Sequence, residues 1–504
     1  MGATIKSILD AGNRAVIVDV ECHVSNGLPA LLIVGFANKA IDESRERIRG
    51  AFANAKLELP RKRITINLAP ADVPKDGTSF DLPIAISILQ ASGLVKKSIP
   101  KHVAFIGELG LDGSVRPVRG VIGKLLAARA KGFNTFYIPT GNLEQARLVP
   151  GLNLIAVPSI RDAYLDLTDT VGLKQITSDA VAPNSTQTSS VDFAEVVGQA
   201  RAKRAMEIAA AGAHNIFLNG APGTGKSMLA KAMPSILPPM QVEEVLEVTH
   251  IHSLASKDYD QIVTARPFRA PHHTASTASI IGGGQHPRPG EISMAHHGIL
   301  FFDEFPEFKR SVVEALRQPL EDREILITRA RENITLPANF LLIATSNPCP
   351  CGYYGTSKPC SCQPYQIEKY KRRVSGPVID RIDLYVDVDE VKHASLLHNQ
   401  KEEPSKVIQQ RILSARSRQR NRYGDPLKYN ANLSNKDILR HIHIDADAEA
   451  LLNEASERLG ISARGYMRTL KVAQTIADLA EAPRVATSHI SEALQYRRPV
   501  EMYD

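Results

Sequence analysis

The sequence predicts a multidomain α/β protein, and three observations lead to this fold class. The chain has 504 residues, too many for one hydrophobic core, and 43% of them are hydrophobic, which is enough to build several cores. A polar segment at residues 176–191 lacks apolar periodicity and indicates a linker. After it, NIFLNGAPGTGKSMLAKAM places a glycine-rich loop between an apolar strand and a helical pattern, an order typical of α/β domains.

Composition narrows the class of protein. The net charge of +7 suits an anionic partner without requiring one. No apolar run reaches the roughly 18 residues that span a bilayer, and the N-terminus lacks the apolar centre of a signal peptide. Four of the five cysteines are clustered, unlike an extracellular disulfide framework. We therefore predict a cytoplasmic protein without a membrane partner.

The first predicted domain, residues 1–175, mixes strands and helices. Strands are predicted in RAVIVDVECHV, LPALLIVGFA and RITINLAP, and a helix in IDESRERIRGAFANA. Within it, PKDGTSFDLPIAISIL places Ser79 between a turn and a pattern that indicates an amphipathic helix. A serine in this place is either a nucleophile, if a base lies beside it, or a residue that caps the helix or lies in its turn.

The glycine-rich loop fits the pattern GxxxxGK[ST] in the strand, loop and helix context that this pattern requires. Its glycines let backbone N–H groups surround a phosphate, and the following helix presents its positive end to the same charge. Lys226 would reach the β- and γ-phosphates of ATP, and the Ser227 hydroxyl would bind Mg²⁺. The predicted nucleotide-binding residues are Gly220, Ala221, Pro222, Gly223, Thr224, Gly225, Lys226, Ser227 and Asp303.

Two further apolar strands end in polar residues. GILFFDEF ends in Asp303, which would hold the Mg²⁺ shell, and Glu304, which would orient and polarise the attacking water. NFLLIATSNP ends in Thr345, Ser346 and Asn347, so that Asn347 would lie beside the γ-phosphate. Three strands that bring polar groups to one edge of a sheet predict a nucleotide hydrolase.

With VVGQ upstream, these residues resemble an AAA+ ATPase. A long insertion before the Asp-Glu strand, followed by LRQPLEDREILITRARENITLP, resembles the helix-2-insert group, which includes magnesium chelatase ATPase subunits and minichromosome maintenance helicases. The resemblance implies an AAA+ core at residues 192–395 and an α-helical lid at 396–504. In that group a basic hairpin residue before the sensor strand touches nucleic acid; Arg329 matches it, with Arg331 on the same face. A charged hairpin exposed to solvent is the alternative.

Two histidine pairs lie in or beside the insertion. A metal site would explain such pairs, but adjacent histidines in a strand point to opposite faces of it. We interpret them as packing residues of the insertion or as surroundings of the nucleotide site. They are His272, His273, His296 and His297.

Two C-terminal segments carry arginines that the resemblance assigns. In SGPVIDRIDLYVDV, Arg381 matches the arginine finger, which completes the γ-phosphate site of the neighbouring subunit and implies a homo-hexameric ring. In GISARGYMRTLKVAQTIADLA, Arg464 matches the lid arginine called sensor 2, and Arg468, one helical turn later, is the second candidate. For either lid residue, a surface salt bridge is the alternative.

Four cysteines follow Asn347 in NPCPCGYYGTSKPCSC. Four thiolates can complete a tetrahedral Zn²⁺ shell, and such a zinc would be structural because no position stays open for water. The usual spacing is CxxC, whereas these residues form two CxC pairs, so free cysteines in a loop are the alternative. The four are Cys349, Cys351, Cys360 and Cys362.

The first domain resembles the Lon protease domain, which has a ribosomal protein S5 domain 2-like fold. Ser79 falls on the nucleophile position, but Ile122 occupies the position of the activating lysine. Lys124 lies two residues later, and in a helix this rotates its side chain by about 200°. Phe80 and Asp81 also replace the small residues that leave room for a peptide. We therefore interpret Ser79 as a cap or turn residue in a domain without proteolysis.

The complete arrangement resembles the ComM/YifB family of magnesium-chelatase-like proteins. The resemblance rests on SFDLPIA, NLAPADVPK, GELGLDGSVRPVRG, APHHTAS, NPCPCGYYG and SGPVIDRID. It implies a ring-forming helicase that drives branch migration in homologous recombination and natural transformation, with branched or single-stranded DNA, other copies of itself and recombination proteins as partners. A chelatase-type motor that acts on a protein partner and an ATP-dependent peptidase are the alternatives.

Overall fold

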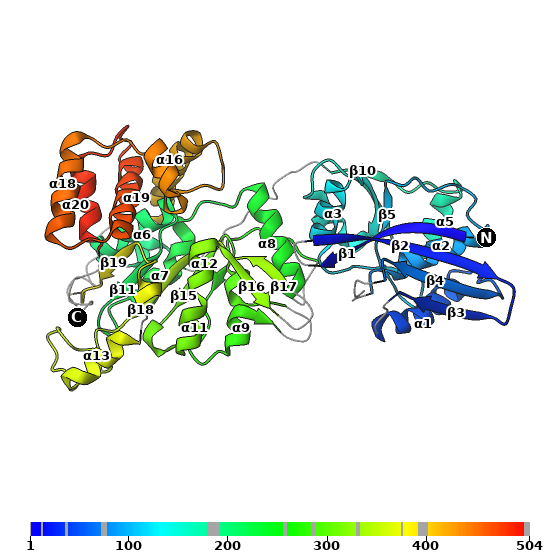
Figure 1. The fold of residues 1–504 in the computed structure, drawn as a ribbon, viewed down its shortest axis with the longest axis horizontal. Coiled ribbons are helices and arrows are strands. Elements are labelled where there is room, and N and C mark those ends of the chain that lie inside the picture. The colour runs from blue at the N-terminus through cyan, green and yellow to red at the C-terminus, as the bar shows by residue number, and fades with distance from the viewer. Residues whose placement is uncertain are drawn as a thin grey trace. The chain divides into compact units, whose positions relative to one another are not determined.

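The computed structural model divides into two compact units (Figure 1). The N-terminal unit contains residues 1–184, 241–264 and 328–336, and the C-terminal unit contains residues 185–240, 265–327 and 337–504. The described residues are 2–11, 14–35, 39–71, 78–178, 191–255, 260–283, 288–328, 333–373, 376–391 and 402–497. No helix among them is both long and apolar enough to cross a membrane.

The N-terminal unit contains two four-stranded sheets. In the first, of order β1-β2-β4-β3, only β3 and β4 are parallel; in the second, of order β10-β9-β8-β5, only β10 is antiparallel to its neighbour. The strands are β1 (Gly2–Ala11), β2 (Arg14–Ser25), β3 (Ala30–Val34), β4 (Arg63–Ala69), β5 (Val103–Phe105), β8 (Thr135–Pro139), β9 (Asn153–Val157) and β10 (Gln175–Thr177), with the short pair β6 (Glu108–Leu109) and β7 (Val115–Arg116). The helices are α1 (Lys39–Asn54), α2 (Asp81–Ala91), α3 (Val121–Ala130), α4 (Leu143–Arg147), α5 (Ile160–Leu167) and α8 (Val242–Ala255).

Helix α2 forms the centre of this unit. The prediction of an amphipathic helix is wrong, because every residue from Asp81 to Ala91 except Gln90 is buried. A helix that is apolar all round has to be covered on every side, and α2 lies in one hydrophobic cluster with residues of β1, β2 and β4. The segment therefore serves as a core helix and presents no apolar stripe to solvent.

Ser79, before α2, and Lys124, in α3, both have structural contacts. The N-cap residue of α2 is Phe80, which makes no side-chain cap bond, so of the two predicted roles for Ser79, cap or turn, the turn is the one found. Ser79 lies in the preceding turn, as the alternative prediction stated, and its carbonyl accepts from the Gly107 N–H at 3.1 Å. Lys124 is buried, and its Nζ donates to the Arg119 carbonyl at 2.6 Å.

A buried ion pair lies at the N-terminal end of α2. Asp81 is fully buried and accepts from Arg47 Nε at 2.6 Å, from Ser44 Oγ and from the Leu109 N–H. Burial raises the pKa of Asp81, although its hydrogen bonds to Arg47 and Ser44 act against this change. The carboxylate thus connects α1, α2 and β6.

Substitution of Asp81 by alanine is expected to destabilise the N-terminal unit by about 3–5 kcal/mol, because the Arg47 guanidinium and the Leu109 N–H lose their buried acceptor. Thermal unfolding of the full chain, followed by circular dichroism, measures the loss. The matched control is Lys97→Ala, which removes a largely exposed ion pair with Asp169 and should change stability little. Equal stability losses in the two variants would contradict the prediction.

The C-terminal unit is built on a five-stranded sheet of order β12-β15-β18-β11-β19, in which all neighbours are parallel. Its strands are β12 (Phe268–Arg269), β15 (Ile299–Phe302), β18 (Leu341–Ser346), β11 (Ile216–Asn219) and β19 (Leu384–Asp387). The remaining short strands are β13 (Gly282–Gly283), β14 (Arg288–Pro289), β16 (Glu324–Thr328) and β17 (Asn333–Pro337), whose residues 333–336 are assigned to the N-terminal unit. β15 and β18 are buried along their whole length, as expected for central parallel strands.

Helices surround this sheet and continue into a helical C-terminal region, as the sequence predicts (Figure 1). The helices before residue 400 are α6 (Ala200–Gly212), α7 (Lys226–Ile236), α9 (Thr277–Ile281), α10 (Glu291–Met294), α11 (Arg310–Ala315), α12 (Arg317–Asp322), α13 (Pro364–Arg372) and α14 (Gly376–Ile379). Those after it are α16 (Ser405–Tyr423), α17 (Asn435–His441), α18 (Ala446–Arg458), α19 (Ala463–Leu479) and α20 (Thr487–Gln495).

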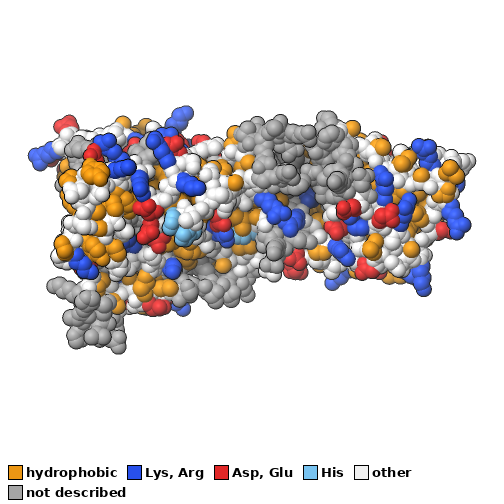
Figure 2. All heavy atoms as spheres, turned by 90° about the horizontal axis from the view of Figure 1, so that it is seen from below, with side chains coloured by type: hydrophobic (Ala, Val, Ile, Leu, Met, Phe, Trp, Pro, Cys, Tyr) orange, Lys and Arg blue, Asp and Glu red, His pale blue; other side chains and the backbone are white. Residues whose placement is uncertain are grey.

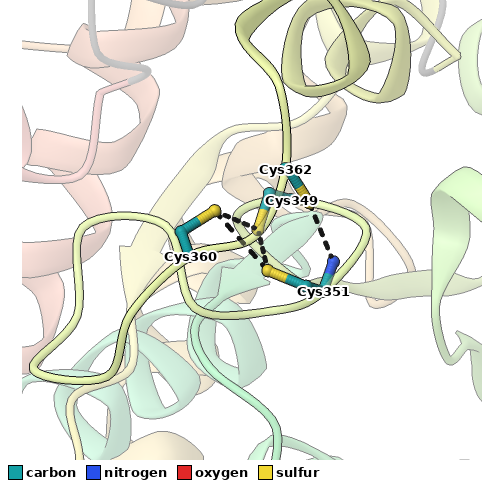
Figure 3. Close-up of side chains that lie close together, drawn as sticks. All are labelled: Cys349, Cys351, Cys360 and Cys362. Atoms are coloured by element: carbon teal, nitrogen blue, oxygen red, sulfur yellow. Dashed lines mark hydrogen bonds between the residues drawn. The ribbon is translucent and has the colours of Figure 1, made fainter.

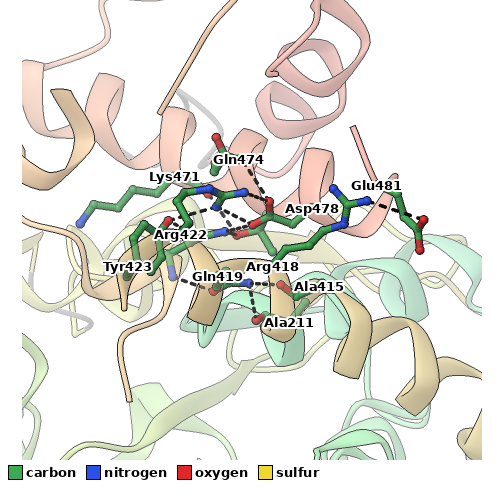
Figure 4. Close-up of polar contacts among 12 residues, drawn as sticks. Ala211, Ala415, Arg418, Gln419, Arg422, Tyr423, Lys471, Gln474, Asp478 and Glu481 are labelled. Carbon is green, nitrogen blue, oxygen red and sulfur yellow. Dashed lines mark hydrogen bonds and ion pairs between the residues drawn. The ribbon is translucent and has the colours of Figure 1, made fainter. Parts of the chain in front are cut away.

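A buried polar network fastens the helical region to the sheet domain (Figure 4). Asp478 of α19 pairs with Arg422 of α16 and also accepts from Asn430 Nδ2 at 2.9 Å. Gln419 of α16 donates to the Ala211 carbonyl of α6 at 3.1 Å. Because buried polar groups cost free energy unless they are paired, these bonds favour one arrangement of α16 and α19 on α6.

The predicted hairpin is present as the two-stranded sheet of β16 and β17. Arg329 and Arg331, predicted to contact DNA, lie at residues 329–332 and therefore outside the described residues. On the face drawn in Figure 2, the described Lys and Arg side chains are spread among acidic and apolar ones instead of forming one basic patch. The mild net charge therefore does not by itself locate a nucleic-acid surface.

The histidine pairs differ from the prediction. Neither pair lies in a strand, and the two rings of each pair are close, with centroids 4.2 Å apart for His272 and His273 and 4.0 Å for His296 and His297. The argument from opposite strand faces was therefore wrong. His296 and His297 are buried, and His296 Nδ1 accepts from the Asn339 N–H at 3.0 Å, which agrees with a packing role.

Candidate nucleotide site

The carboxyl edge of the parallel sheet gathers the predicted phosphate-site residues. β11 pairs with β18 so that Asn219 lies opposite Ser346, and β15 pairs with β18 so that Phe302 lies opposite Ala344. The residues that follow these strands therefore emerge side by side: the phosphate loop after β11, Asp303 and Glu304 after β15, and Asn347 after β18.

The phosphate loop has the open, glycine-dependent shape that an anion requires. Gly223 and Gly225 have φ angles of 81° and 92°, in the left-handed region that favours glycine. A Cβ added to either residue would meet nothing within 4 Å, so the space in front of the loop is open. α7 begins at Lys226, and the N–H groups of its first turn have no acceptor within the helix. The loop and the helix end thus fit a phosphate group.

Lys226 occupies the centre of the site. Its side chain is buried, and Nζ donates to the carbonyls of Gly220 at 2.5 Å and Ala221 at 2.8 Å. Nζ also contacts Asn347 Oδ1 at 3.2 Å, which brings together two predicted residues that are 121 positions apart. Burial lowers the pKa of Lys226, and the charges of Asp303 and Glu304 oppose this change.

Asp303 connects α7 to β18 through its two carboxylate oxygens. Ser227 Oγ donates to Oδ2 at 2.9 Å, and Thr345 Oγ1 donates to Oδ1 at 2.6 Å. Thr345 Oγ1 also accepts from the Glu304 N–H at 3.0 Å, and Glu304 has a φ angle of 52°. A hydroxyl and a carboxylate at this distance form the donor set that Mg²⁺ uses beside nucleotide phosphates. The residues present therefore fit the ion.

The sequence patterns assigned no role to Thr345 beyond its place at a strand end. The side chain is fully buried and contacts the two acidic positions of the site, so it would orient both of them. Thr345 lies 42 residues after Asp303 in the sequence, so no short motif connects them. Thr345 and the acidic pair meet because β15 and β18 are neighbouring strands of the sheet.

Substitution of Thr345 by valine, which has a similar volume but no hydroxyl, is expected to lower the rate of ATP turnover about 10-fold, because one hydrogen bond is worth about 1 kcal/mol or more beside a charge. Steady-state ATPase assays at saturating ATP measure the effect. Thr345→Ser retains the hydroxyl and should keep most of the activity. A valine variant with wild-type turnover would show that Thr345 does not position the acidic pair.

The two predicted arginines lie at the opposite edge of the sheet, called the amino edge because its strands begin there. Arg381 precedes Leu384, the first residue of β19, and β19 runs parallel to β11 with Leu384 opposite Ile216. Its guanidinium pairs with Glu321, and Arg464 reaches the other oxygen of the same carboxylate at 3.3 Å. The hydrogen bond from Arg381 is the main reason why the pKa of Glu321 is lowered.

Both arginines line one cavity of about 730 Å³, whose wall carries both cationic and acidic side chains. Three more cationic side chains lie on its wall, namely Arg323, Arg468 and Lys471. Arg468, the second candidate for the lid arginine, donates to the Ile382 carbonyl at 2.8 Å. β11 has four residues and therefore separates the amino edge from the phosphate loop by about 13 Å. Arg381 thus cannot reach the phosphate loop of its own chain.

The four predicted cysteines converge in the loop between β18 and α13 (Figure 3). Their sulfur atoms all lie within 4.8 Å of one another, and the Cys349 Sγ is 3.3 Å from that of Cys351 and 3.7 Å from that of Cys360. The Tyr353 N–H hydrogen bond is the main cause that lowers the pKa of Cys351 to about 5. Four sulfurs in this arrangement can hold a metal ion.

Comparison with known proteins relates this geometry to a family. Residues 192–396 match the family described as magnesium chelatase, subunit ChlI, residues 20–142 match subunit ChlI of Mg-chelatase, and residues 402–497 match the ChlI C-terminal family. A shorter similarity, 35% identity over 104 residues or 20% of this chain and 13% of the relative, is to the Lon protease of Aster yellows witches'-broom phytoplasma.

Two relatives align with almost the complete chain. The Competence protein ComM of Haemophilus influenzae is 42% identical over 504 residues, which is 99% of this chain and 98% of the relative. YifB of Salmonella typhimurium is 40% identical over 489 residues, 96% of this chain and 95% of the relative. The protein therefore belongs to the ComM/YifB family of magnesium-chelatase-like AAA+ proteins.

Proposed function

We propose that this protein is a ring-forming ATPase that moves along DNA and promotes branch migration during homologous recombination and natural transformation. The observation that carries the ATPase activity is the meeting of Lys226, Asp303 and Asn347 at one sheet edge. The DNA substrate is supported by the 42% identity to a protein named for competence. Branched or single-stranded DNA and recombination proteins are the proposed partners.

In the proposed reaction, each residue of the carboxyl edge has one task. The backbone of the phosphate loop binds ATP, and Lys226 exchanges its carbonyl partners for the β- and γ-phosphate oxygens. Mg²⁺, held by Ser227 and Asp303, would neutralise phosphate charge when bound. Glu304 accepts a proton from the attacking water, and Asn347 orients the γ-phosphate.

The amino edge is proposed to serve the next subunit. In a homo-hexameric ring, Arg381 would leave Glu321 and approach the γ-phosphate of the neighbouring copy, with Arg464 as the lid arginine at the same phosphate. The ring explains why these arginines and the phosphate loop lie at opposite edges of one sheet. It also makes hydrolysis depend on assembly.

The remaining assignments follow the family. We propose that residues 1–175 form a Lon-like domain of the S5 domain 2-like fold without a catalytic dyad, that 176–191 form a linker, that 192–395 form a helix-2-insert ATPase core, and that 396–504 form its lid. Arg329 and Arg331 would contact the DNA backbone in the pore of the ring. Zn²⁺ is the proposed structural metal of the four cysteines.

The proposal is tested with purified protein and a synthetic four-way DNA junction. ATP and Mg²⁺ should drive conversion of the junction into two duplexes, and DNA should stimulate ATP hydrolysis. The Lys226→Ala and Glu304→Gln variants should do neither. Wild-type protein that hydrolyses ATP but leaves the junction intact and unbound would refute the motor activity.

A second candidate is a chelatase-type motor that acts on a protein partner. It is supported by the match of three separate segments to descriptions of a magnesium chelatase subunit. Affinity purification from cells distinguishes the two functions. Stoichiometric recovery of a protein partner, together with the lack of DNA binding by the purified chain, would favour the chelatase-type motor.

A further inference from the structure

The loop that carries the four cysteines begins and ends at the nucleotide site. It leaves β18 at Asn347, whose Oδ1 contacts Lys226 Nζ at 3.2 Å. It returns as α13, where Tyr370 is buried; burial raises the pKa of Tyr370, and the neighbouring Ser346 side chain acts against this change. The position of Asn347 therefore depends on how this loop is closed.

A third contact joins the loop to the phosphate loop itself. Gly352 lies between the cysteine pairs with a φ angle of 87° and packs so closely on Pro222 that an added Cβ would be 2.5 Å from its Cγ and Cδ atoms. Its N–H donates to the Cys349 carbonyl at 3.0 Å, which places this turn next to the first cysteine. The conformation of the cysteine turn thus determines where Gly352 packs against Pro222.

The four sulfur atoms are arranged as in a metal centre. Tetrahedral Zn²⁺ with bonds of about 2.3 Å holds thiolate sulfurs about 3.8 Å apart, and the three observed distances among Cys349, Cys351 and Cys360 are 3.3, 3.5 and 3.7 Å. Backbone N–H groups point at two of the sulfurs: Tyr354 N–H donates to Cys349 Sγ at 3.3 Å and Cys351 N–H to Cys362 Sγ at 3.4 Å. Such outer bonds orient metal-bound thiolates.

We propose that Zn²⁺ bound by these four cysteines closes the loop over the nucleotide site and thereby controls ATP turnover through Asn347 and Pro222. Without the metal, the bonds that hold the two CxC arms together are missing, the arms separate, and Gly352 and Asn347 lose their positions. The inference rests on the proposed ATP hydrolysis. It assigns the metal a positioning role, because four protein ligands leave no site for a reacting water.

The first experiment asks whether the metal is present. Protein refilled with Zn²⁺ and desalted should contain about one zinc per chain by elemental analysis, and cobalt substitution should give the visible spectrum of a tetrahedral thiolate site. Cys349→Ser with Cys351→Ser should abolish both signals. The matched control is Cys22→Ser, at the buried fifth cysteine in β2, which should change neither. Wild-type protein without stoichiometric zinc or a cobalt spectrum would overturn the proposal.

The second experiment asks whether the loop controls turnover. Gly352→Ala should lower kcat about 10-fold or more with zinc content unchanged, because its Cβ would displace Pro222 of the phosphate loop and a small displacement of positioned groups slows chemistry. Gly355→Ala is the control, since Gly355 has a similar φ of 75° but its added Cβ would meet nothing within 4 Å. Equal kcat values for Gly352→Ala, Gly355→Ala and wild type would overturn the coupling.

Removal of zinc by a chelator gives the third readout. Turnover should fall about 10-fold or more and recover when Zn²⁺ is added back, while far-ultraviolet circular dichroism stays unchanged. Undiminished ATP turnover by the zinc-free protein would refute the positioning role even if DNA junctions still migrate. Conversely, loss of turnover on zinc removal without any effect of DNA would support this inference and refute the DNA motor.

Discussion

Substitution of Glu304 by glutamine is expected to slow ATP hydrolysis at least about 100-fold while ATP binding is retained. A positioned general base contributes about 10²–10⁴-fold to a rate, and an amide of the same shape cannot take up the proton of the attacking water. Glu304 is exposed at the carboxyl edge, and its backbone is held by Thr345 Oγ1. The variant should therefore trap ATP and not release phosphate.

Single-turnover phosphate release and the affinity for a fluorescent ATP analogue separate the two effects. Lys226→Ala should lose nucleotide binding as well, because Lys226 contacts the phosphates in the proposed complex. The control is Glu307→Gln, three residues further along, where an exposed carboxylate pairs with Arg373 at 2.8 Å outside the site. A Glu304→Gln variant that hydrolyses ATP as fast as Glu307→Gln would exclude Glu304 as the base.

Two inactive variants are expected to restore each other's activity when mixed. Arg381→Ala should lower turnover about 10³-fold or more, as removal of an arginine finger does, and Lys226→Ala should be inactive. In a mixed ring, an Arg381→Ala subunit with an intact phosphate loop can lie next to a Lys226→Ala subunit with an intact arginine. Random mixing at equal amounts makes about a quarter of the interfaces complete.

This complementation follows from the opposite sheet edges of Arg381 and the phosphate loop. ATPase assays of mixtures that have been dissociated and reassembled give the measurement. Mixing Lys226→Ala with a chain that carries both substitutions supplies no intact phosphate loop and should stay inactive. Mixed rings that assemble, as shown by differently tagged subunits, but recover no activity would contradict action between subunits. The same mixture with Arg464→Ala tests the second arginine.

Short sequence patterns were sufficient to predict features that depend only on neighbouring residues in the chain. The glycines of the phosphate loop, the apolar run before Asp303 and the cysteine pairs are short patterns whose backbone consequences are nearly independent of the remaining chain. The strand, loop and helix around Lys226 and the helical C-terminal region are present as predicted. The four cysteines, which the spacing left either as a metal site or as free cysteines in a loop, have their sulfurs close together.

Predictions failed where the result depends on long-range packing. The pattern of α2 does not show that other elements cover it on all sides, and the histidine pairs were assigned to strands that do not exist. For α2, the deciding contacts join segments far apart in the sequence, which periodicity does not record.

The sequence by itself determined the candidate ligands of a phosphate, a magnesium ion and a structural metal, because residue type and spacing define such candidates. Only the tertiary structure decided which of these residues contact one another. Thr345 meets Asp303 because β15 and β18 are neighbours, Gly352 packs on Pro222, and one carboxylate, Glu321, holds both arginines at the far edge of the sheet. The order of strands in a sheet is a property of the whole fold, and no short segment contains it.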